Sequence, residues 1–387
     1  MNCYNIYNED FEFYGGDMQK CFSLPEYPCH TDMWDELASE KRPIVVYGMG
    51  NGADKLIRRF EKYGIKIADF FASDGFVRGH SFHGYQILSF SDIKKKYSDF
   101  VIVLSFASNR REVIDMLYEI DDNYEMYVPD MPVADECEYF DKEFYNENYA
   151  KILLALNSFS DEKSRNNFCA ILNYKLSGKL LYLRQATDTK EYMYGLIKMQ
   201  SIANIIDAGA YNGDTLREAK LHFDNLKTAV AIEPDVRNFK KLAKYCEAEE
   251  EICIKAINGA AWNVEGDGDF SNSGNRNSSI NSTSSFEHKT DTVKLVKIDI
   301  VSDVGTDYIK YDVEGAELEA LEGSALTISR DKPALLISVY HRSRDVFELV
   351  NYIAEKYPFY KMYLLRLECI PAWEMNLIAV RKDATYE

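Results

Sequence analysis

The chain has 387 residues, of which 46% are hydrophobic and 28% charged, so it has the apolar side chains to fold and is too long for one ordinary core. Its 63 acidic residues outnumber its 45 basic residues, which gives a formal net charge of -18 and disfavours nucleic acid and anionic membranes as partners. The eight cysteines are scattered without a CxxC pair, so we interpret them as reduced thiols of a cytoplasmic protein.

Residues 1–132 predict a first α/β domain. Its acidic N-terminus lacks the pattern of a signal peptide, and its apolar runs are too short to cross a membrane. The stretch 42–74 is typical of a strand, a glycine turn, an amphipathic helix and a second strand. The elements expected after it are a short hairpin or edge strand at 82–90, a brief helix at 91–97, a buried strand at 100–108, a helix at 109–120 and a returning segment at 124–129.

Residues 133–200 carry apolar side chains at helical spacing and no strand run, which predicts a helical connector. From residue 201 strands and helices alternate again, so residues 201–387 predict a second doubly wound α/β domain. A Gly-, Ser- and Asn-rich stretch at 265–286 interrupts the alternation, and we interpret it as a mobile loop or an irregular hairpin.

A glycine turn, "IIDAGAYNGDT" at 205–215, follows the first strand of the second domain. It combines acids with small residues that let a ligand approach the backbone, namely Asp207, Gly209, Ala210, Gly213 and Asp214. About 20 residues later a second strand ends in Glu233, where a carboxylate can accept hydrogen bonds from both hydroxyls of a ribose. The turn has no basic residue, which disfavours a phosphate-bearing ligand. These features predict a site for an adenosine-type cofactor, and S-adenosylmethionine (SAM) fits.

The stretch from about 190 to 380 resembles the FkbM family of SAM-dependent methyltransferases, through "IIDAGAYNGDT", "AIEPD", "NGAAW", "YIKYDVEGAE" and "PALLISVYH". The resemblance implies a class I methyltransferase fold and O-methylation of a sugar, glycan or natural-product hydroxyl, with a role in polysaccharide biosynthesis. It also implies that Asn258–Trp262 lies beside the adenine. The residues that it assigns to SAM are Asp207, Gly209, Ala210, Gly213, Asp214, Glu233, Pro234, Gly259, Ala260, Ala261, Trp262 and Asp312.

Catalysis is assigned to residues of the next two strand ends. Asp312 follows the fourth strand and is expected to face the sulfonium methyl, and Lys310 shares its strand face because side chains alternate. Glu314 and Glu317 come next, where carboxylates also suit a helix N-terminus. His341 ends the following strand; it is either structural or a general base with a pKa near neutrality.

Three further assignments concern the surroundings of these residues. Glu374 resembles an acid in the C-terminal segment of the family, or is a surface acid. Asp299, Asp312 and Glu314 offer oxygen ligands for Mg²⁺, but we expect no required metal because no His/Cys ligand set exists. The stretch Gly266–Ser285 is expected to face the methyl acceptor, or to be an insertion without a role.

A second glycine turn near the N-terminus contains Gly48, Gly50 and Ala53, with Asp74 closing the next strand. It resembles the nucleotide-sugar-binding Rossmann-like domain found before some bacterial sugar-modifying transferases. Such a domain either presents a nucleotide-linked acceptor or binds nothing. The leading hypothesis is a SAM-dependent O-methyltransferase. Its rivals are an NAD(P)-dependent oxidoreductase or epimerase, which lacks a recognisable Tyr-x-x-x-Lys pair, and a non-catalytic binding protein.

Overall fold

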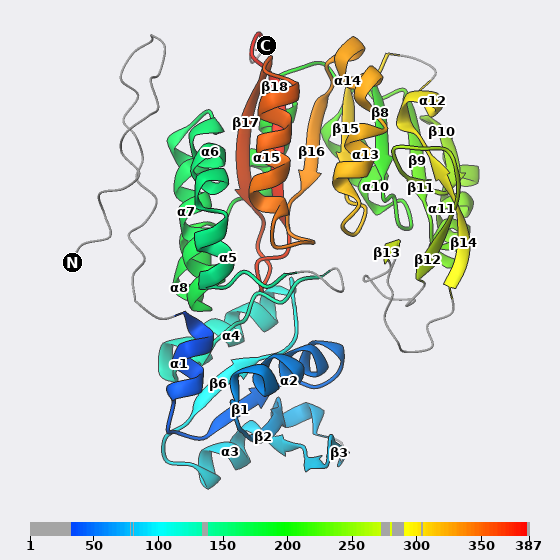
Figure 1. Cartoon of the computed structure of the whole chain (residues 1–387). Coiled ribbons are helices and arrows are strands. Elements are labelled where there is room, and N and C mark those ends of the chain that lie inside the picture. The colour runs from blue at the N-terminus through cyan, green and yellow to red at the C-terminus, as the bar shows by residue number, and fades with distance from the viewer. Residues whose placement is uncertain are drawn as a thin grey trace, which may run out of the picture.

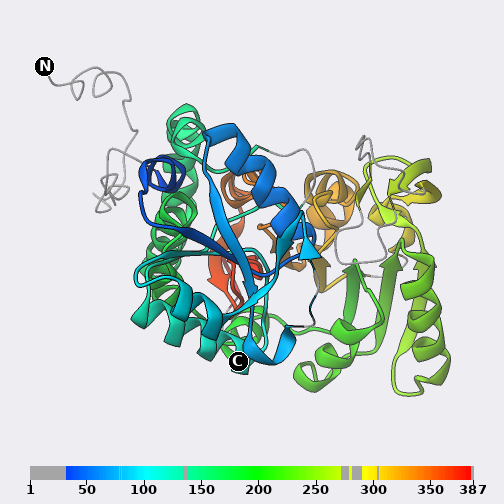
Figure 2. The ribbon, with the colours of Figure 1, turned by 90° about the horizontal axis from the view of Figure 1, so that it is seen from below.

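The computed structural model describes residues 32–77, 79, 81–133, 138–271, 279–280, 290–302 and 305–384. A seven-stranded sheet lies above a five-stranded sheet in the view of Figure 1, and a small four-stranded sheet lies at the right. Figure 2 shows the five-stranded sheet from below. In these ranges no helix has both the length and the apolar composition that a bilayer crossing requires.

The first sheet has five parallel strands in the order β5-β2-β1-β6-β7. They are β1 (Ile44–Tyr47), β2 (Ile67–Ala72), β5 (Leu88–Ser89), β6 (Val101–Leu104) and β7 (Met126–Tyr127). In chain order the arrangement is 3-2-1-4-5, which is that of a doubly wound sheet. The residues of β1 and β6 are all buried, because helices cover both faces of a parallel sheet. The remaining elements are α1 (Met33–Ser39), α2 (Asn51–Tyr63), α3 (Phe90–Lys96), α4 (Arg111–Asn123) and the hairpin of β3 (Ser81–Phe82) and β4 (Tyr85–Gln86).

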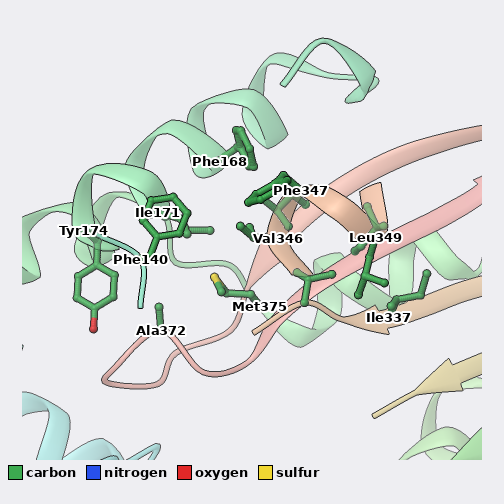
Figure 3. Close-up of a cluster of buried hydrophobic side chains, with 14 of the residues drawn as sticks. Phe140, Phe168, Ile171, Tyr174, Ile337, Val346, Phe347, Leu349, Ala372 and Met375 are labelled. Atoms are coloured by element: carbon green, nitrogen blue, oxygen red, sulfur yellow. The ribbon is translucent and has the colours of Figure 1, made fainter. Parts of the chain in front are cut away.

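A run of helices connects the two large sheets, where helical spacing predicts it. They are α5 (Lys142–Glu147), α6 (Tyr149–Ser158), α7 (Glu162–Ser177), α8 (Leu180–Gln185) and α9 (Lys190–Ile197). Figure 3 shows Phe168 and Ile171 of α7 near Val346 and Phe347 of the seven-stranded part, in one cluster of buried side chains. That cluster also includes side chains of β1 and β6. Independent folding of the two predicted domains therefore stays a prediction.

The seven-stranded sheet has the order β10-β9-β8-β15-β16-β18-β17, which is 3-2-1-4-5-7-6 in chain order. Its strands are β8 (Asn204–Ala208), β9 (Thr228–Glu233), β10 (Cys253–Asn258), β15 (Tyr308–Tyr311), β16 (Ala334–Ser338), β17 (Tyr360–Arg366) and β18 (Met375–Arg381). Strand β18 is antiparallel to both neighbours, and the other paired strands are parallel. The helices are α10 (Asp214–His222), α11 (Val236–Ala248), α12 (Ile298–Val301), α13 (Glu317–Glu322), α14 (Ala325–Asp331) and α15 (Asp345–Lys356).

The Gly-, Ser- and Asn-rich stretch contributes to the four-stranded sheet. This sheet contains β11 (Ala260–Ala261), β12 (Gly266–Ser271), β13 (Ser279–Ile280) and β14 (Thr290–Val296). Strand β12 pairs antiparallel with both β13 and β14, which agrees with the irregular hairpin among the two interpretations of this stretch. Residues 272–278 and 281–289 lie outside the described residues, so the expected contact with an acceptor stays a prediction.

A backbone bridge joins the loop after β6 to the loop between β17 and β18. The N–H of Ser108 donates to the carbonyl of Ile370 at 2.7 Å, and the N–H of Ile370 donates to the carbonyl of Ser108 at 2.9 Å. Arg111 adds an ion pair with Glu368 at 3.0 Å. The carboxyl end of a strand in the first sheet is thereby tied to the second sheet.

Candidate active site

A cavity of about 440 Å³ lies at the carboxyl ends of the parallel strands β8, β9, β15 and β16. Each of these strand ends supplies a lining residue: Gly209, Glu233, Asp312 and Ser338. The predicted site residues that line it are Gly209, Asp214, Glu233, Pro234, Ala260, Ala261, Lys310, Asp312 and Glu314. Glu374, which the sequence left between two interpretations, lines it as well. Residues that are distant in sequence therefore meet at one crevice.

The glycines of the predicted site have packing roles that the sequence did not reveal. Gly209 has φ +89°, and a Cβ there would lie 1.9 Å from the carbonyl oxygen of Asp312. A Cβ on Gly213, which precedes α10 with φ +82°, would lie 2.6 Å from the ring of Tyr245. A Cβ on Gly259 would lie 2.7 Å from a methyl carbon of Val296. Glycine is needed at these positions so that the walls of the site can approach one another.

Five residues assigned to SAM are not among the residues that line the cavity: Asp207, Gly213, Gly259, Ala210 and Trp262. Ala210 is fully buried in the core beside α10, where its small size serves packing. Trp262 is half-buried and is not among the residues that line the cavity. Its backbone N–H donates to the carbonyl of Val296 at 2.9 Å. The expected contacts of all five residues with SAM stay predictions.

Glu233 is held at the end of β9 by backbone donors. Its Oε2 accepts a hydrogen bond from the N–H of Tyr211 at 2.8 Å, and its Oε1 accepts one from the N–H of Asp235 at 2.9 Å. Burial raises the pKa of Glu233 to about 7, although both backbone bonds oppose this. Each carboxylate oxygen has a second lone pair, so the group can receive two more donors.

Lys310 lies between two carboxylates, on the side of β15 that the alternation of side chains predicts. Its Nζ is 3.2 Å from Oδ2 of Asp312 and 3.6 Å from Oδ1 of Asp207. Burial raises the pKa of Asp207 to about 6, with the charge of Lys310 opposing. Burial acts in the same sense on Asp312, but Lys310, His341 and the hydroxyl of Ser338 together hold the pKa of Asp312 well below its usual value. Asp312 is therefore a fixed negative charge and a weak base.

His341 is fully buried behind the cavity and is not among its lining residues. Its Nδ1 lies 2.9 Å from Glu317, and its Nε2 lies 3.5 Å from Glu314 and 3.6 Å from Asp312. Burial alone would lower the pKa of His341, but these three carboxylates raise it to about 10. The imidazolium form at neutral pH has no lone pair for a proton. This differs from a general base with a pKa near neutrality, which the strand-end position had indicated.

Three non-glycine residues that line the cavity have a left-handed backbone: Tyr211 at φ +47°, Glu314 at φ +55° and Glu374 at φ +83°. Such conformations cost on the order of 1–3 kcal/mol each, and they persist where the surroundings enforce them. At Glu314 the surroundings include Glu317, whose Oε1 accepts from the N–H groups of Val313 at 3.0 Å and Gly315 at 3.4 Å. The buried pair of Glu317 and His341 thus supports the strained turn that presents Glu314.

Several lining residues were not predicted. They are mainly polar or aromatic, and examples are Asn109, Lys190, Tyr194, Tyr308, Ser338, Tyr340 and Asn376. Tyr340 precedes His341 in "SVYH", so its position near the end of a strand could have indicated a site residue. Its hydroxyl donates to Asp312 at 3.3 Å. No sequence signal marked Asn109, because it lies in the loop after β6 of the five-stranded sheet, far along the chain from the other lining residues.

Of the three acids considered as Mg²⁺ ligands, Asp299 contacts backbone donors. Asp299 accepts hydrogen bonds from the N–H groups of Leu326 at 3.2 Å and Thr327 at 2.8 Å, where α14 begins. Among the residues that the structure describes, no three His, Cys, Asp or Glu side chains gather in a way that would hold a metal ion.

At the N-terminal turn, packing explains part of the glycine pattern. A Cβ on Gly48 would lie 2.7 Å from the ring of Phe106, and Ala53 is buried in the core. Asp74 accepts from the N–H of Ser91 at 3.1 Å, while a Cβ on Gly50 would meet only open space. Nucleotide binding at this turn stays a prediction.

The stability of the protein is expected to fall as the pH rises from about 4 to 10. Asp207 and Glu233 have raised pKa values when folded, so the folded chain binds their protons more tightly; this contribution is complete below their unfolded pKa values of about 4 and is lost once the pH passes their folded values of about 6 and about 7. The contribution of His341 is complete below its unfolded pKa and is lost as the pH rises through about 10. Thermal unfolding measured across this range tests the sign. A melting temperature that rises from pH 7 to 10 would contradict it, and His341→Gln should flatten the alkaline part of the profile.

Part of the chain is similar to known methyltransferases. Residues 207–362 match the family described as Methyltransferase FkbM domain. Methyltransferase FkbM from Methylobacillus flagellatus KT has a similar structure, with a TM-score of 0.65 and 20% identity, covering 87% of this chain and 90% of that chain. An rRNA methylase from Streptococcus thermophilus has a TM-score of 0.33 and 11% identity, covering 49% of this chain and 94% of that chain. None of the curated proteins compared matches the chain. Residues 207–362 are therefore similar to an FkbM methyltransferase domain, and the chain shares its fold with the Methylobacillus protein.

Proposed function

We propose that the protein is a SAM-dependent methyltransferase that methylates a hydroxyl group of a sugar, a glycan or a natural product. The observation that carries the proposal is the position of Glu233. It lines the cavity within the region that matches the FkbM domain, and its two oxygens have lone pairs left for a ribose. A ribose at Glu233 places the rest of the cofactor in the same cavity.

The remaining lining residues fit a cofactor without phosphate groups. Among the described lining residues, each of the two lysines already contacts a carboxylate: Lys190 lies 2.8 Å from Glu218, and Lys310 lies 3.2 Å from Asp312. Asp312 is ionised and suits a positively charged sulfonium. When bound, SAM supplies an activated methyl group. The chain supplies the ribose contact, the negative charge and the orientation of the acceptor.

Removal of the acceptor's hydroxyl proton is assigned to Glu314. Its carboxylate lines the cavity, whereas the positively charged His341 lies behind the cavity wall. Asp312 is the poorer base, because Lys310, His341 and Ser338 stabilise its anion. His341 and Glu317 act as positioning residues that hold the turn from Val313 to Gly315.

Glu314→Gln is expected to lower kcat by about 10²- to 10⁴-fold, because the amide cannot accept the proton. SAM affinity should change less than threefold, since the ribose contact is untouched. The experiment is transfer of labelled methyl groups from SAM to a panel of glycosides and other hydroxyl compounds, with Glu355→Gln on the exposed side of α15 as the matched control. Full activity in Glu314→Gln would remove Glu314 from proton transfer. Tight SAM binding by the unaltered protein without transfer to any acceptor would favour the non-catalytic alternative.

A further inference from the structure

We propose that the loop after β6 completes the acceptor-binding part of this cavity, and that this part takes an uncharged, hydroxyl-bearing group and excludes phosphate and carboxylate groups. The inference rests on the proposed methyl transfer and narrows its substrate class. In this proposal the five-stranded sheet contributes to acceptor binding through that loop, whether or not its own glycine turn binds a nucleotide.

The first observation is the position of Asn109. The loop between the end of β6 at Leu104 and the start of α4 at Arg111 brings this exposed side chain to the cavity. Among the described lining residues, Asn109 alone comes from the first 132 residues. The amide offers a donor and an acceptor, which matches a hydroxyl group.

The second observation is that this loop is hydrogen-bonded to another loop that lines the cavity. Ser108 and Ile370 exchange two backbone hydrogen bonds, of 2.7 and 2.9 Å, next to Asn109. The loop that contains Ile370 presents Leu367 and Glu374 to the same cavity, and the N–H of Leu367 donates to the carbonyl of Glu374 at 3.0 Å. Asn109 and Glu374 are therefore held by one connected backbone arrangement.

The third observation is the charge of the lining. Within the described part of the lining, carboxylates outnumber lysines; the carboxylates belong to Asp214, Glu218, Glu233, Asp235, Asp312, Glu314 and Glu374. The lysines Lys190 and Lys310 are each engaged by a carboxylate, so neither is available for an anionic acceptor. A phosphate or carboxylate in this cavity meets like charge, whereas a neutral hydroxyl can donate to the carboxylates.

A buried polar group independently indicates a polar occupant. Tyr308 lines the cavity and is 2% exposed, and its hydroxyl has no hydrogen-bond partner within the described part of the chain. Buried hydroxyls are normally paired, so this one calls for a ligand group or an ordered water. The diphosphate of a nucleotide-linked acceptor would have to remain outside the cavity.

Saturation-transfer NMR on the full-length protein tests the proposal. The protein is first saturated with S-adenosylhomocysteine, whose binding is measured separately by calorimetry. The probes are methyl glycosides of glucose, galactose and mannose, each paired with its 6-phosphate and its uronic acid. We expect transfer to at least one neutral glycoside and at least tenfold weaker signals from its charged partners. Equal or stronger signals from the charged probes, or none from any neutral probe, would overturn the inference. Failure of S-adenosylhomocysteine itself to bind would instead contradict the proposed function.

Variants of the loop test its part in the site. Asn109→Trp should abolish the neutral-probe signal and Asn109→Ala should weaken it at least threefold, with S-adenosylhomocysteine affinity within twofold of the unaltered protein. Asn123→Trp, at the exposed end of the neighbouring α4, is the matched control. Unchanged probe signals in both Asn109 variants would overturn the role of the loop. If Asn109→Trp alters the thermal unfolding profile, the alanine variant alone decides the result.

Discussion

Glu233→Ala is expected to weaken SAM binding by about 30- to 150-fold, which corresponds to about 2–3 kcal/mol. The substitution removes the carboxylate that is proposed to accept both ribose hydroxyls. It also leaves the N–H groups of Tyr211 and Asp235 without this acceptor. Isothermal titration with SAM at pH 8 measures the loss, because Glu233 is ionised above its pKa of about 7.

Glu247→Ala is the matched control for this substitution, since Glu247 is an exposed acid on α11, which follows Glu233 in the chain. Circular dichroism must show an intact fold in both variants. Unchanged SAM affinity in folded Glu233→Ala would remove Glu233 from the cofactor site. SAM affinity of the unaltered protein should also decrease from pH 8 to 6, because protonation takes away one acceptor oxygen.

Glu317→Gln is expected to lower the free energy of unfolding by about 3–5 kcal/mol at pH 7, because it removes the nearest carboxylate from a buried positive charge. The pair is enclosed: His341 is 0% exposed and Glu317 is 1% exposed, with 2.9 Å between Nδ1 and Oε1. The glutamine oxygen can still accept the backbone bonds of the turn, so the change isolates the charge. Urea denaturation measures the effect, and the loss should shrink as the pH approaches 10, where His341 becomes neutral.

A double-mutant cycle separates this ion pair from general damage to the core. The combination of Glu317→Gln with His341→Gln should be less destabilising than the sum of the two single changes. Glu355→Gln, an exposed acid of α15, is the surface control. A loss below 1 kcal/mol in Glu317→Gln, or strictly additive effects in the cycle, would contradict a charged His341.

The strand ends that line the site were predictable from the sequence, because ligands of parallel α/β sheets bind at the carboxyl ends of the strands. The apolar run before Asp207 and the run that ends in Glu233 are adjacent strands, and the register pairs Asp207 with Ala231. Lys310 pairs with Asp207 in the next strand, which brings their side chains together. The alternation of side chains along a strand and the glycine turn after it are local sequence patterns, so they were sufficient to predict these neighbours.

The electrostatic state of His341 was not predictable in the same way. It depends on three carboxylates that converge from a turn and a helix start, and on full burial, which no spacing rule describes. The position of Asn109 in the cavity lining was not predictable either, because it depends on how the loop after β6 contacts the loop before β18 through Ser108 and Ile370. The packing roles of Gly213 and Gly259 likewise depend on contacts with elements far along the chain, from Tyr245 and Val296.

The cavity beside Glu233 is proposed as the cofactor site for SAM. Isothermal titration of the full-length protein with SAM, compared with the same titration with NAD⁺, tests this proposal most directly. We expect saturable binding of one SAM per chain and no detectable heat of binding with NAD⁺, because the two lysines among the described lining residues already contact carboxylates. Saturable NAD⁺ binding together with no binding of SAM would remove SAM from this cavity.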